Sequence, residues 1–254
     1  MDPHLLIAIV LSALIGVSLG VLGGGGSILA VPLLVYVAQI DVRTAIGMSL
    51  AVVGATSLGG AAVHARGGRV DLKAALLFGG AGMVGAPLGA QVTHLVPPRM
   101  LLVLFAALMI VVGVLMLRVR RPQSHSTPPR PRRLRLLGAG MGVGLLTGFL
   151  GVGGGFLIVP ALTLFAGLPI RTAIGTSLLV IALNAAAGLA GHIRHGGLPL
   201  ELTLAFSAAS FVGVLFGVKL SAGLAPVQLR RAFAAFVVLI GLSLFVTNLL
   251  PIGE

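Results

Sequence analysis

The sequence predicts an all-α, polytopic membrane protein made of two homologous repeats, each with four full-length helices and one short or broken helix. The composition is the first observation: 57% of the 254 residues are hydrophobic and 9% are charged, whereas about a quarter of the residues of soluble domains are charged. Second, several apolar segments match the roughly 17–25 residues that cross a bilayer. Third, the chain repeats itself. We therefore expect eight to ten helical segments.

The repeat becomes visible when the sequence is shifted by 128 positions, which aligns residues 16–113 with 144–241 without a gap. More than a third of the aligned positions are identical, including polar positions that a shared hydrophobic bias does not explain. The chain is therefore expected to contain three regions. They are a first transmembrane repeat (1–117), an Arg/Pro-rich linker (118–135) and a second transmembrane repeat (136–254).

Each repeat is expected to hold the same elements in the same order. A first helix is followed by a glycine-rich break, a short helix and three ordinary spans. The first helices are expected at 5–22 and 136–150, the short helices at 27–39 and 155–167, and the spans at 44–63, 73–96, 100–117, 172–191, 200–223 and 229–250. The first apolar segment lacks a preceding Lys or Arg and a small-residue cleavage site, so a removed signal peptide is not expected.

Consecutive glycines interrupt both repeats at the same point. Close helix packing needs a small residue only at every fourth position, which explains pairs such as Gly85 and Gly89. A consecutive run instead permits unusual backbone angles and the close approach of a solute. The first turn of the short helix that follows has unpaired N–H groups and a partial positive charge. The breaks therefore predict an anion site built largely from backbone. Its candidates are Gly23, Gly24, Gly25, Gly26, Ser27, Gly151, Gly153, Gly154 and Gly155.

Polar side chains within the spans extend this candidate site. The hydroxyls of Ser49, Thr176 and Ser177 either face a solute path or bond back to their own helix. Asn184 is a candidate because polar groups inside membranes are frequently functional.

Two further residue pairs recur in both repeats. His64 and His192 either carry protons in a coupled transport step or mark the membrane boundary. Thr44 and Thr172 precede apolar spans and are predicted to be helix N-caps.

The orientation of the two repeats depends on the short helices. A helix of 13 residues is about 20 Å long, which is less than the hydrocarbon core. If the short helices do not cross, the repeats are parallel; if they do, the repeats are inverted. With the linker inside, the inverted arrangement places more basic residues on the cytoplasmic side, and we favour it. The linker arginines are Arg118, Arg120, Arg121, Arg130, Arg132, Arg133 and Arg135.

The composition argues against several other functions. Cysteine is absent, which excludes disulfides and thiolate chemistry. The five acidic residues lie at loops, span edges or termini, so we expect no metal site, no cofactor and no enzymatic activity. The net charge is +12, and seven of the 17 basic residues lie in one short linker without aromatic residues, which argues against nucleic-acid binding and suits anionic membrane lipids.

The chain resembles the sulfite exporter TauE/SafE family of membrane permeases. The resemblance rests on Gly20-x-x-Gly23-x-Gly25-Gly26 followed by Val31-Pro32, on its repeat Gly148-x-x-Gly151-x-Gly153-Gly154 with Val159-Pro160, and on two Ala-Ile-Gly-x-Ser-Leu segments. It covers nearly the whole chain outside the linker. The second repeat departs from the first, with Val152 at the position of Gly24 and Gly155 at that of Ser27. The resemblance implies transport of sulfur oxyanions or organosulfonates, such as sulfite or sulfoacetate.

The sequence therefore predicts a secondary transporter that moves a small anion across the cell membrane by alternating access, with the linker on the cytoplasmic side. The alternative is an anion channel that uses the same backbone groups as a filter. The expected partners are the anionic solute and membrane lipids. The small-residue faces of the spans would also permit a homodimer.

Overall fold

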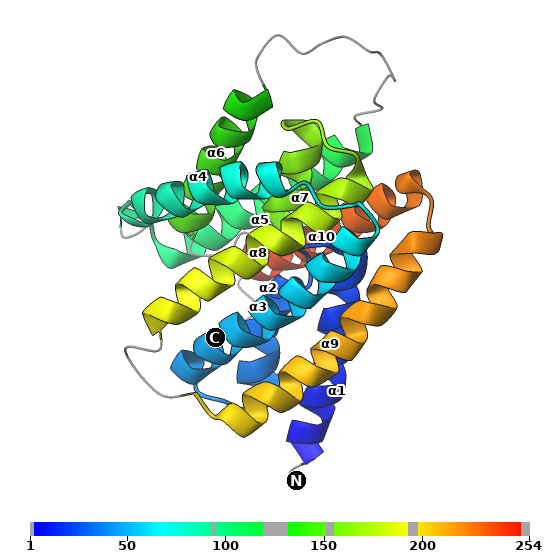
Figure 1. Ribbon diagram of the computed structural model, residues 1–254. Coiled ribbons are helices and arrows are strands. Elements are labelled where there is room, and N and C mark those ends of the chain that lie inside the picture. The colour runs from blue at the N-terminus through cyan, green and yellow to red at the C-terminus, as the bar shows by residue number, and fades with distance from the viewer. Residues whose placement is uncertain (1–2, 93–94, 119–131, 151–154, 193–197, 250–254) are drawn as a thin grey trace.

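The computed structural model of the chain is all-helical in its described part, which comprises residues 3–92, 95–118, 132–150, 155–192 and 198–249 (Figure 1). The first repeat contains α1 (Pro3–Leu22), α2 (Ser27–Pro32), the π-helix η1 (Leu33–Val37), α3 (Val42–Arg66), α4 (Leu72–Ala90) and α5 (Pro98–Arg118). The second contains α6 (Arg132–Leu150), α7 (Gly155–Leu164), α8 (Ile170–His192), α9 (Leu200–Gly223) and α10 (Pro226–Leu249).

Seven of the described helices are long and apolar enough to cross a membrane, namely α3, α4, α5, α6, α8, α9 and α10. Within the residues whose side chains are described, α1 is apolar from Ile7 to Leu22, and α2 with η1 and α7 are shorter still. The prediction of an all-α polytopic membrane protein with a short or broken helix in each half is confirmed. One span is shorter than expected, because α4 ends at Ala90 rather than near residue 96.

The helices of the two repeats correspond in order and bounds. Adding 128 to the residue numbers brings α1 onto α6, α2 with η1 onto α7, α3 onto α8, α4 onto α9 and α5 onto α10. The packing is reciprocal as well, since α1 packs along α9 while α4 packs along α6. The fourth helix of each repeat therefore packs against the first helix of the other repeat.

These two exchanged pairs run parallel and are tightly packed. In α1, Gly16 lies against Ser210 and Gly20 against Gly217 of α9, so residue numbers rise together along the pair. A hydrogen bond joins this pair, in which the Ser210 hydroxyl donates to the Ser12 carbonyl at 2.8 Å. Gly140 and Gly148 of α6 lie directly against the backbone of α4, and residue numbers again rise together along the pair. Small residues allow this close helix–helix contact.

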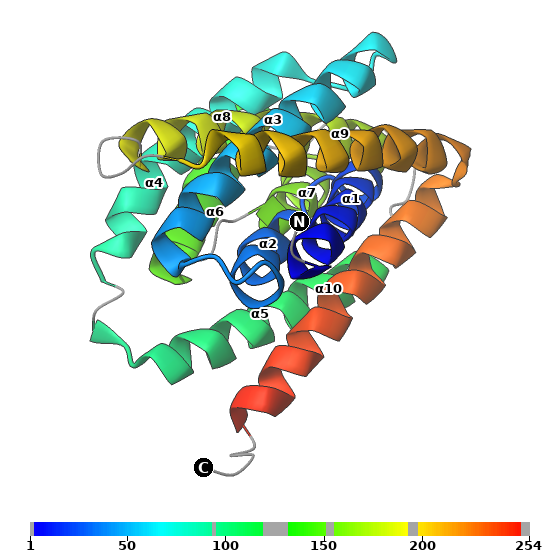
Figure 2. The same cartoon turned by 90° about the horizontal axis from the view of Figure 1, so that it is seen from below.

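Corresponding helices of the two repeats instead cross antiparallel. A Cβ on Gly54 of α3 would contact Ala185 of α8, whereas one on Gly60 would contact Leu178, so residue numbers run in opposite directions. The α5–α10 pair behaves in the same way. Figure 2 shows α3, α8 and α9 on one side of the molecule, α5 and α10 on the other, and α1, α2 and α7 between them.

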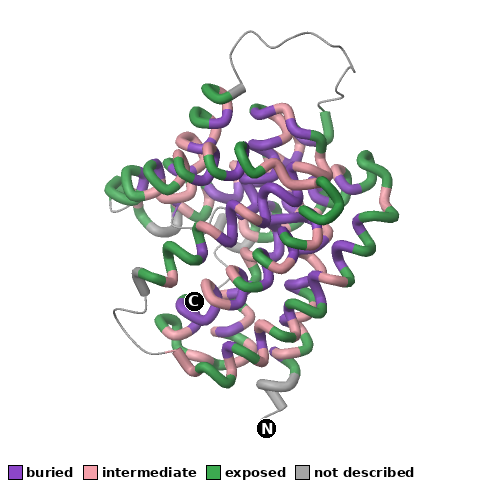
Figure 3. Tube along the Cα trace, viewed as in Figure 1, coloured by how far each residue is buried: buried purple, intermediate pink, exposed green. Residues whose placement is uncertain are grey.

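The core is centred on the short helix α7. Its residues from Gly155 to Leu162 are all buried, and this part of the molecule is purple in Figure 3. Phe156 of α7 meets Phe105 of α5 edge to face, with ring centroids 5.2 Å apart. Aromatic pairs favour this geometry because the positive ring edge meets the negative face.

The predicted N-caps Thr44 and Thr172 are wrong. The N-cap of α3 is Asp41, whose carboxylate accepts hydrogen bonds from the backbone N–H groups of Arg43 and Thr44 at 3.1 Å. Hydrogen bonds from the Thr44 side chain and backbone hold the pKa of Asp41 below its usual value. α8 begins at Ile170, so Thr172 lies inside its first turn. Both helices start about two residues earlier than their apolar pattern indicates, because the capping position need not be apolar.

Candidate solute site at the glycine breaks

The short helices of the two repeats begin next to each other. A Cβ on Gly24 would collide with the Gly155 carbonyl, and one on Gly155 would collide with the Ser27 hydroxyl and lie 3.0 Å from the Gly24 carbonyl oxygen. Gly155 also lies against Ile181 in the middle of α8. The first break and the start of α7 are therefore in backbone contact inside the molecule, although 131 positions separate Gly24 from Gly155 in the sequence.

Gly23 ends α1 in a conformation that favours glycine. Its φ is +81° and its N–H donates to the Leu19 carbonyl at 2.8 Å. A side chain with a Cβ is strained in this left-handed region. A Cβ here would also lie 2.6 Å from the Ser177 hydroxyl oxygen. The helix is thus interrupted where the sequence predicted, and Ser177 of α8 lies against the interruption.

The remaining residues of the first break pack closely. A Cβ on Gly25 would lie 2.7 Å from the ring of Phe236, and one on Gly26 would lie 2.6 Å from the Ile15 carbonyl oxygen. The Ser27 hydroxyl donates to the Gly24 carbonyl at 2.8 Å. Ser27 is the first residue of α2. Its hydroxyl bonds back to Gly24, and its side chain does not cap that helix.

Part of the predicted site lies outside the described residues. This applies to Gly151, Gly153 and Gly154 of the second break and to the side chain of His192. Gly155 is described, is buried and begins α7.

The predicted polar residues of α3 and α8 have different environments. Ser49 is buried, and the Ser177 hydroxyl donates to the Ile174 carbonyl at 2.7 Å, which is the bond back to its own helix that we considered. Thr176 accepts a hydrogen bond from the Asp71 N–H at 3.0 Å, so it holds the loop before α4. Asn184 is exposed.

Sequence reasoning missed a group of buried hydroxyls. Thr56 and Ser57 of α3 and Ser18 of α1 have buried side-chain oxygens without a hydrogen-bond partner. Both ring nitrogens of His64 are likewise buried and unpartnered, and the His64 side chain is 3% exposed. Buried polar groups nearly always have a partner, and water or a ligand commonly supplies it where the protein does not. The sequence does show that these hydroxyls lie within predicted helices. It does not show which face of a uniformly apolar helix is buried, so it could not single them out as site residues.

His64 connects this group to the first break. It lies beside the Gly20 backbone of α1 and packs against Gly175 of α8. Ser49, Thr56 and His64 follow helical spacing, so they share one face of α3. We refer to Ser49, Thr56, Ser57 and His64 as the polar face of α3. Within the described residues, no group of three or more His, Cys, Asp or Glu side chains could hold a metal ion.

The seven apolar helices define a class of protein, a multi-pass membrane protein. Comparisons with known proteins give the family. The family described as "Sulfite exporter TauE/SafE" matches residues 8–244, and the chain therefore belongs to it.

Several relatives are similar along nearly their whole length. A probable membrane transporter protein of Xylella fastidiosa strain 9a5c is 36% identical, with 94% of each chain covered. A probable membrane transporter protein of Bacillus subtilis is 31% identical over 94% of this chain and 99% of its own. One from Haemophilus influenzae is 28% identical over 96% and 99%. No solved structure matches.

Proposed function

We propose that the protein is a secondary transporter that binds a small anion at the paired glycine breaks and releases it by alternating access. The observation that carries this proposal is the contact between Gly24 and the first residue of α7. α7 is a 10-residue helix whose N-terminal N–H groups and dipole favour an anion. Discontinuous helices that meet inside the membrane are a recurring way to build a transporter site.

The proposed substrate is a sulfur oxyanion or organosulfonate, such as sulfite or sulfoacetate. The family description supports the solute class. The distribution of charge agrees, because the chain has only five acidic residues, and the one that falls within a candidate span, Glu201, lies in the first turn of α9. A site made of glycine backbone and hydroxyls would not repel an anion.

The repeats are proposed to be inverted in the cell membrane, with the linker on the cytoplasmic side. If a two-fold axis relating the repeats ran along the membrane normal, equivalent spans would point in the same direction. The antiparallel crossings of α3 with α8 and of α5 with α10 support an axis in the membrane plane. The surplus of basic residues near the linker supports the cytoplasmic assignment.

The polar face of α3 is proposed to line a hydrated path that leads to the breaks. Unpartnered buried hydroxyls and the His64 ring would be satisfied by water or solute in such a path. Ser177 lies against the break, and we keep Thr176 and Asn184 as path candidates on α8.

His64, with its counterpart His192, is the proposed proton carrier. Flux that loses its pH dependence in H64Q/H192Q would support this role, and unchanged pH dependence would refute it.

The central experiment measures sulfite flux in proteoliposomes for Gly24→Ala and Gly155→Ala. Both added methyl groups would push the breaks apart, so we expect flux to fall at least about tenfold while the detergent-solubilised protein remains monodisperse. Gly80→Ala is the matched control, because a Cβ at Gly80 would meet nothing within 4 Å. Unchanged flux in both folded variants would contradict the site.

A milder variant covers the case in which these substitutions prevent folding. At Gly25 the added methyl would press on the Phe236 side chain, which can move, rather than on backbone. Gly25→Ala is therefore expected to fold and to lose part of the flux. Counterflow then separates a carrier from a channel: a carrier accelerates labelled anion when unlabelled anion is supplied on the other side, and a channel does not.

A further inference from the structure

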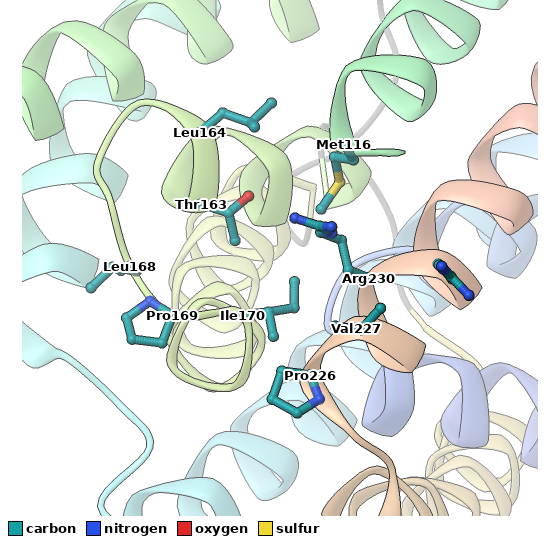
Figure 4. A pocket seen from close by; sticks show the side chains of 10 residues that line it. Met116, Thr163, Leu164, Leu168, Pro169, Ile170, Pro226, Val227 and Arg230 are labelled. Atoms are coloured by element: carbon teal, nitrogen blue, oxygen red, sulfur yellow. The ribbon is translucent and has the colours of Figure 1, made fainter. Parts of the chain in front are cut away.

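A second candidate site lies away from the glycine breaks, where α5, α7, α8 and α10 come together (Figure 4). It is a cavity of about 560 Å³. The side chains that line it are Met116, Thr163, Leu164, Leu168, Pro169, Ile170, Pro226, Val227, Arg230 and Arg231. We call this cavity the arginine pocket.

The arginine pocket lies at helix ends, on the side of the molecule where the linker begins. Met116 comes two residues before the end of α5 at Arg118, and the linker follows. Ile170 and Pro226 are the first residues of α8 and α10. All three helices are candidate spans, so their ends mark the depth of the membrane–water boundary. This is the depth at which phospholipid head groups lie.

The lining combines cations with an apolar wall. Arg230 and Arg231 contribute guanidinium groups, and none of the lining residues is acidic. Arg231 is exposed, whereas Arg230 is partly buried with its Nε fully buried. Guanidinium groups bind phosphate oxygens with well-matched, often bidentate geometry. The wall of Met116, Leu164 and Ile170 offers no hydrogen bonds and suits a hydrocarbon chain.

The size of the pocket argues against the transported anion as its occupant. A cavity of about 560 Å³ is in the range that encloses a drug-sized molecule. A four- or five-atom oxyanion would fill a small part of it and leave the apolar wall in contact with water. An amphiphile with an anionic head and an apolar tail would use both the arginines and the wall.

Arg230 and Arg231 have no arginine counterparts at the equivalent positions of the first repeat. The positions of Arg230 and Arg231 are occupied in the first repeat by Leu102 and Val103, and that of Pro169 by the acidic Asp41. The equivalent region of the first repeat has a single arginine, Arg99, at the position of Val227, and lacks the cation pair. The pair belongs to the second repeat and lies near the end of α5, and basic pockets between spans suit anionic lipids.

We infer that the arginine pocket binds an anionic phospholipid, with the phosphate at Arg230 and Arg231 and an acyl chain against Met116, Leu164 and Ile170. The test uses the full-length protein, purified in a neutral detergent. Its thermal unfolding is measured with added phosphatidylglycerol, with phosphatidylcholine of the same acyl chains, and with inorganic phosphate at equal concentration. We expect a rise in melting temperature only with phosphatidylglycerol, since ligands that bind the folded state stabilise it.

The variant R230Q/R231Q is expected to lose this rise. The control R43Q/K73Q removes two other exposed positive charges outside the pocket and is expected to keep it. Equal rises in both double variants would overturn the proposal. A rise with inorganic phosphate alone, lost in R230Q/R231Q, would also overturn it, because the site would then bind a free anion rather than a lipid.

A third variant keeps the test decisive if R230Q/R231Q does not fold. Val227 is half exposed and lines the pocket. Val227→Trp would fill the cavity while leaving both arginines in place. We expect this variant to lose the response to phosphatidylglycerol, and a full response in folded V227W protein would refute the assigned position of the lipid.

Discussion

The short helices of the two repeats descend from one sequence but differ in structure. α7 runs without interruption from Gly155 to Leu164 and is buried over most of its length. Its counterpart is divided into α2 and the π-helix η1 after Pro32. Most residues of that counterpart are only partly buried, and Tyr36 is 79% exposed. The same position in the duplication is therefore buried in one repeat and partly accessible in the other.

Side chains near the two prolines differ as well. A proline inside a helix removes one backbone hydrogen bond. In α7 the Thr163 hydroxyl donates to the carbonyls of Val159 and Pro160, at 3.0 and 2.9 Å. The first repeat has Val35 at the position of Thr163, which has no hydroxyl, and there the helix widens into a π-turn. The proposed alternating access would require the two halves to differ in this way in any one state.

The largest expected effect comes from core truncation. Phe156→Ala removes a fully buried ring from α7 and should cost about 3–5 kcal/mol. Ile28→Ala, at the equivalent position of α2, should cost less because Ile28 is only partly buried. Thermal or denaturant unfolding in detergent measures both. Equal losses would show that the difference in burial between the short helices does not exist in the isolated protein.

A smaller effect is expected at the exchanged helix pairs. Ser210→Ala removes one hydrogen bond between α9 and α1, the bond to the Ser12 carbonyl, and should destabilise the protein by about 1 kcal/mol. The equivalent position on α4 is Gly82, where a Cβ would make ordinary contact at 3.4 Å with the Gly140 carbonyl oxygen. Gly82→Ser should therefore be tolerated, with an unfolding midpoint equal to or above that of the parent protein. A lower midpoint for G82S than for S210A would contradict this comparison.

Thr163→Val makes α7 resemble the first repeat at one position. It removes the hydroxyl that donates to the carbonyls of Val159 and Pro160, with an expected loss of about 1 kcal/mol. The reciprocal variant V35T should be stabilised, by a smaller amount than T163V is destabilised. If both variants unfold like the parent, the hydroxyl is not what distinguishes the two short helices.

The smallest effect is expected at the helix caps. Asp41 caps α3, whereas the second repeat has Pro169 there. Because the folded-state pKa of Asp41 is lowered, its stabilising contribution is complete above the unfolded pKa and is lost as pH falls through the folded one. Asp41→Ala should lower the melting temperature slightly at pH 7, and the difference should shrink below about pH 4. A difference that does not change with pH would exclude the carboxylate as its cause.

The helices and the position of the first break could be predicted from sequence, because apolar length and consecutive glycines are local signals. Thr44 was misassigned as a cap because the apolar pattern starts later than the helix, whose true cap is Asp41. The contact of Gly24 with Gly155 could not be predicted, since it depends on how distant helices pack. Thr56 was missed for the same reason, because in a uniformly apolar span the buried face is determined by partners.

The exchange of fourth helices between repeats has a consequence for how such a chain could arise. α1 lies along α9 and α6 along α4, so a single repeat alone would leave the partners of both its first and fourth helices missing. An ancestor of one repeat's length would have needed a second copy of itself to complete either contact. Fusion through the linker would then have joined two chains that were already interlocked. Separate expression of 1–117 and 136–254 should accordingly yield stable protein only when both fragments are made together.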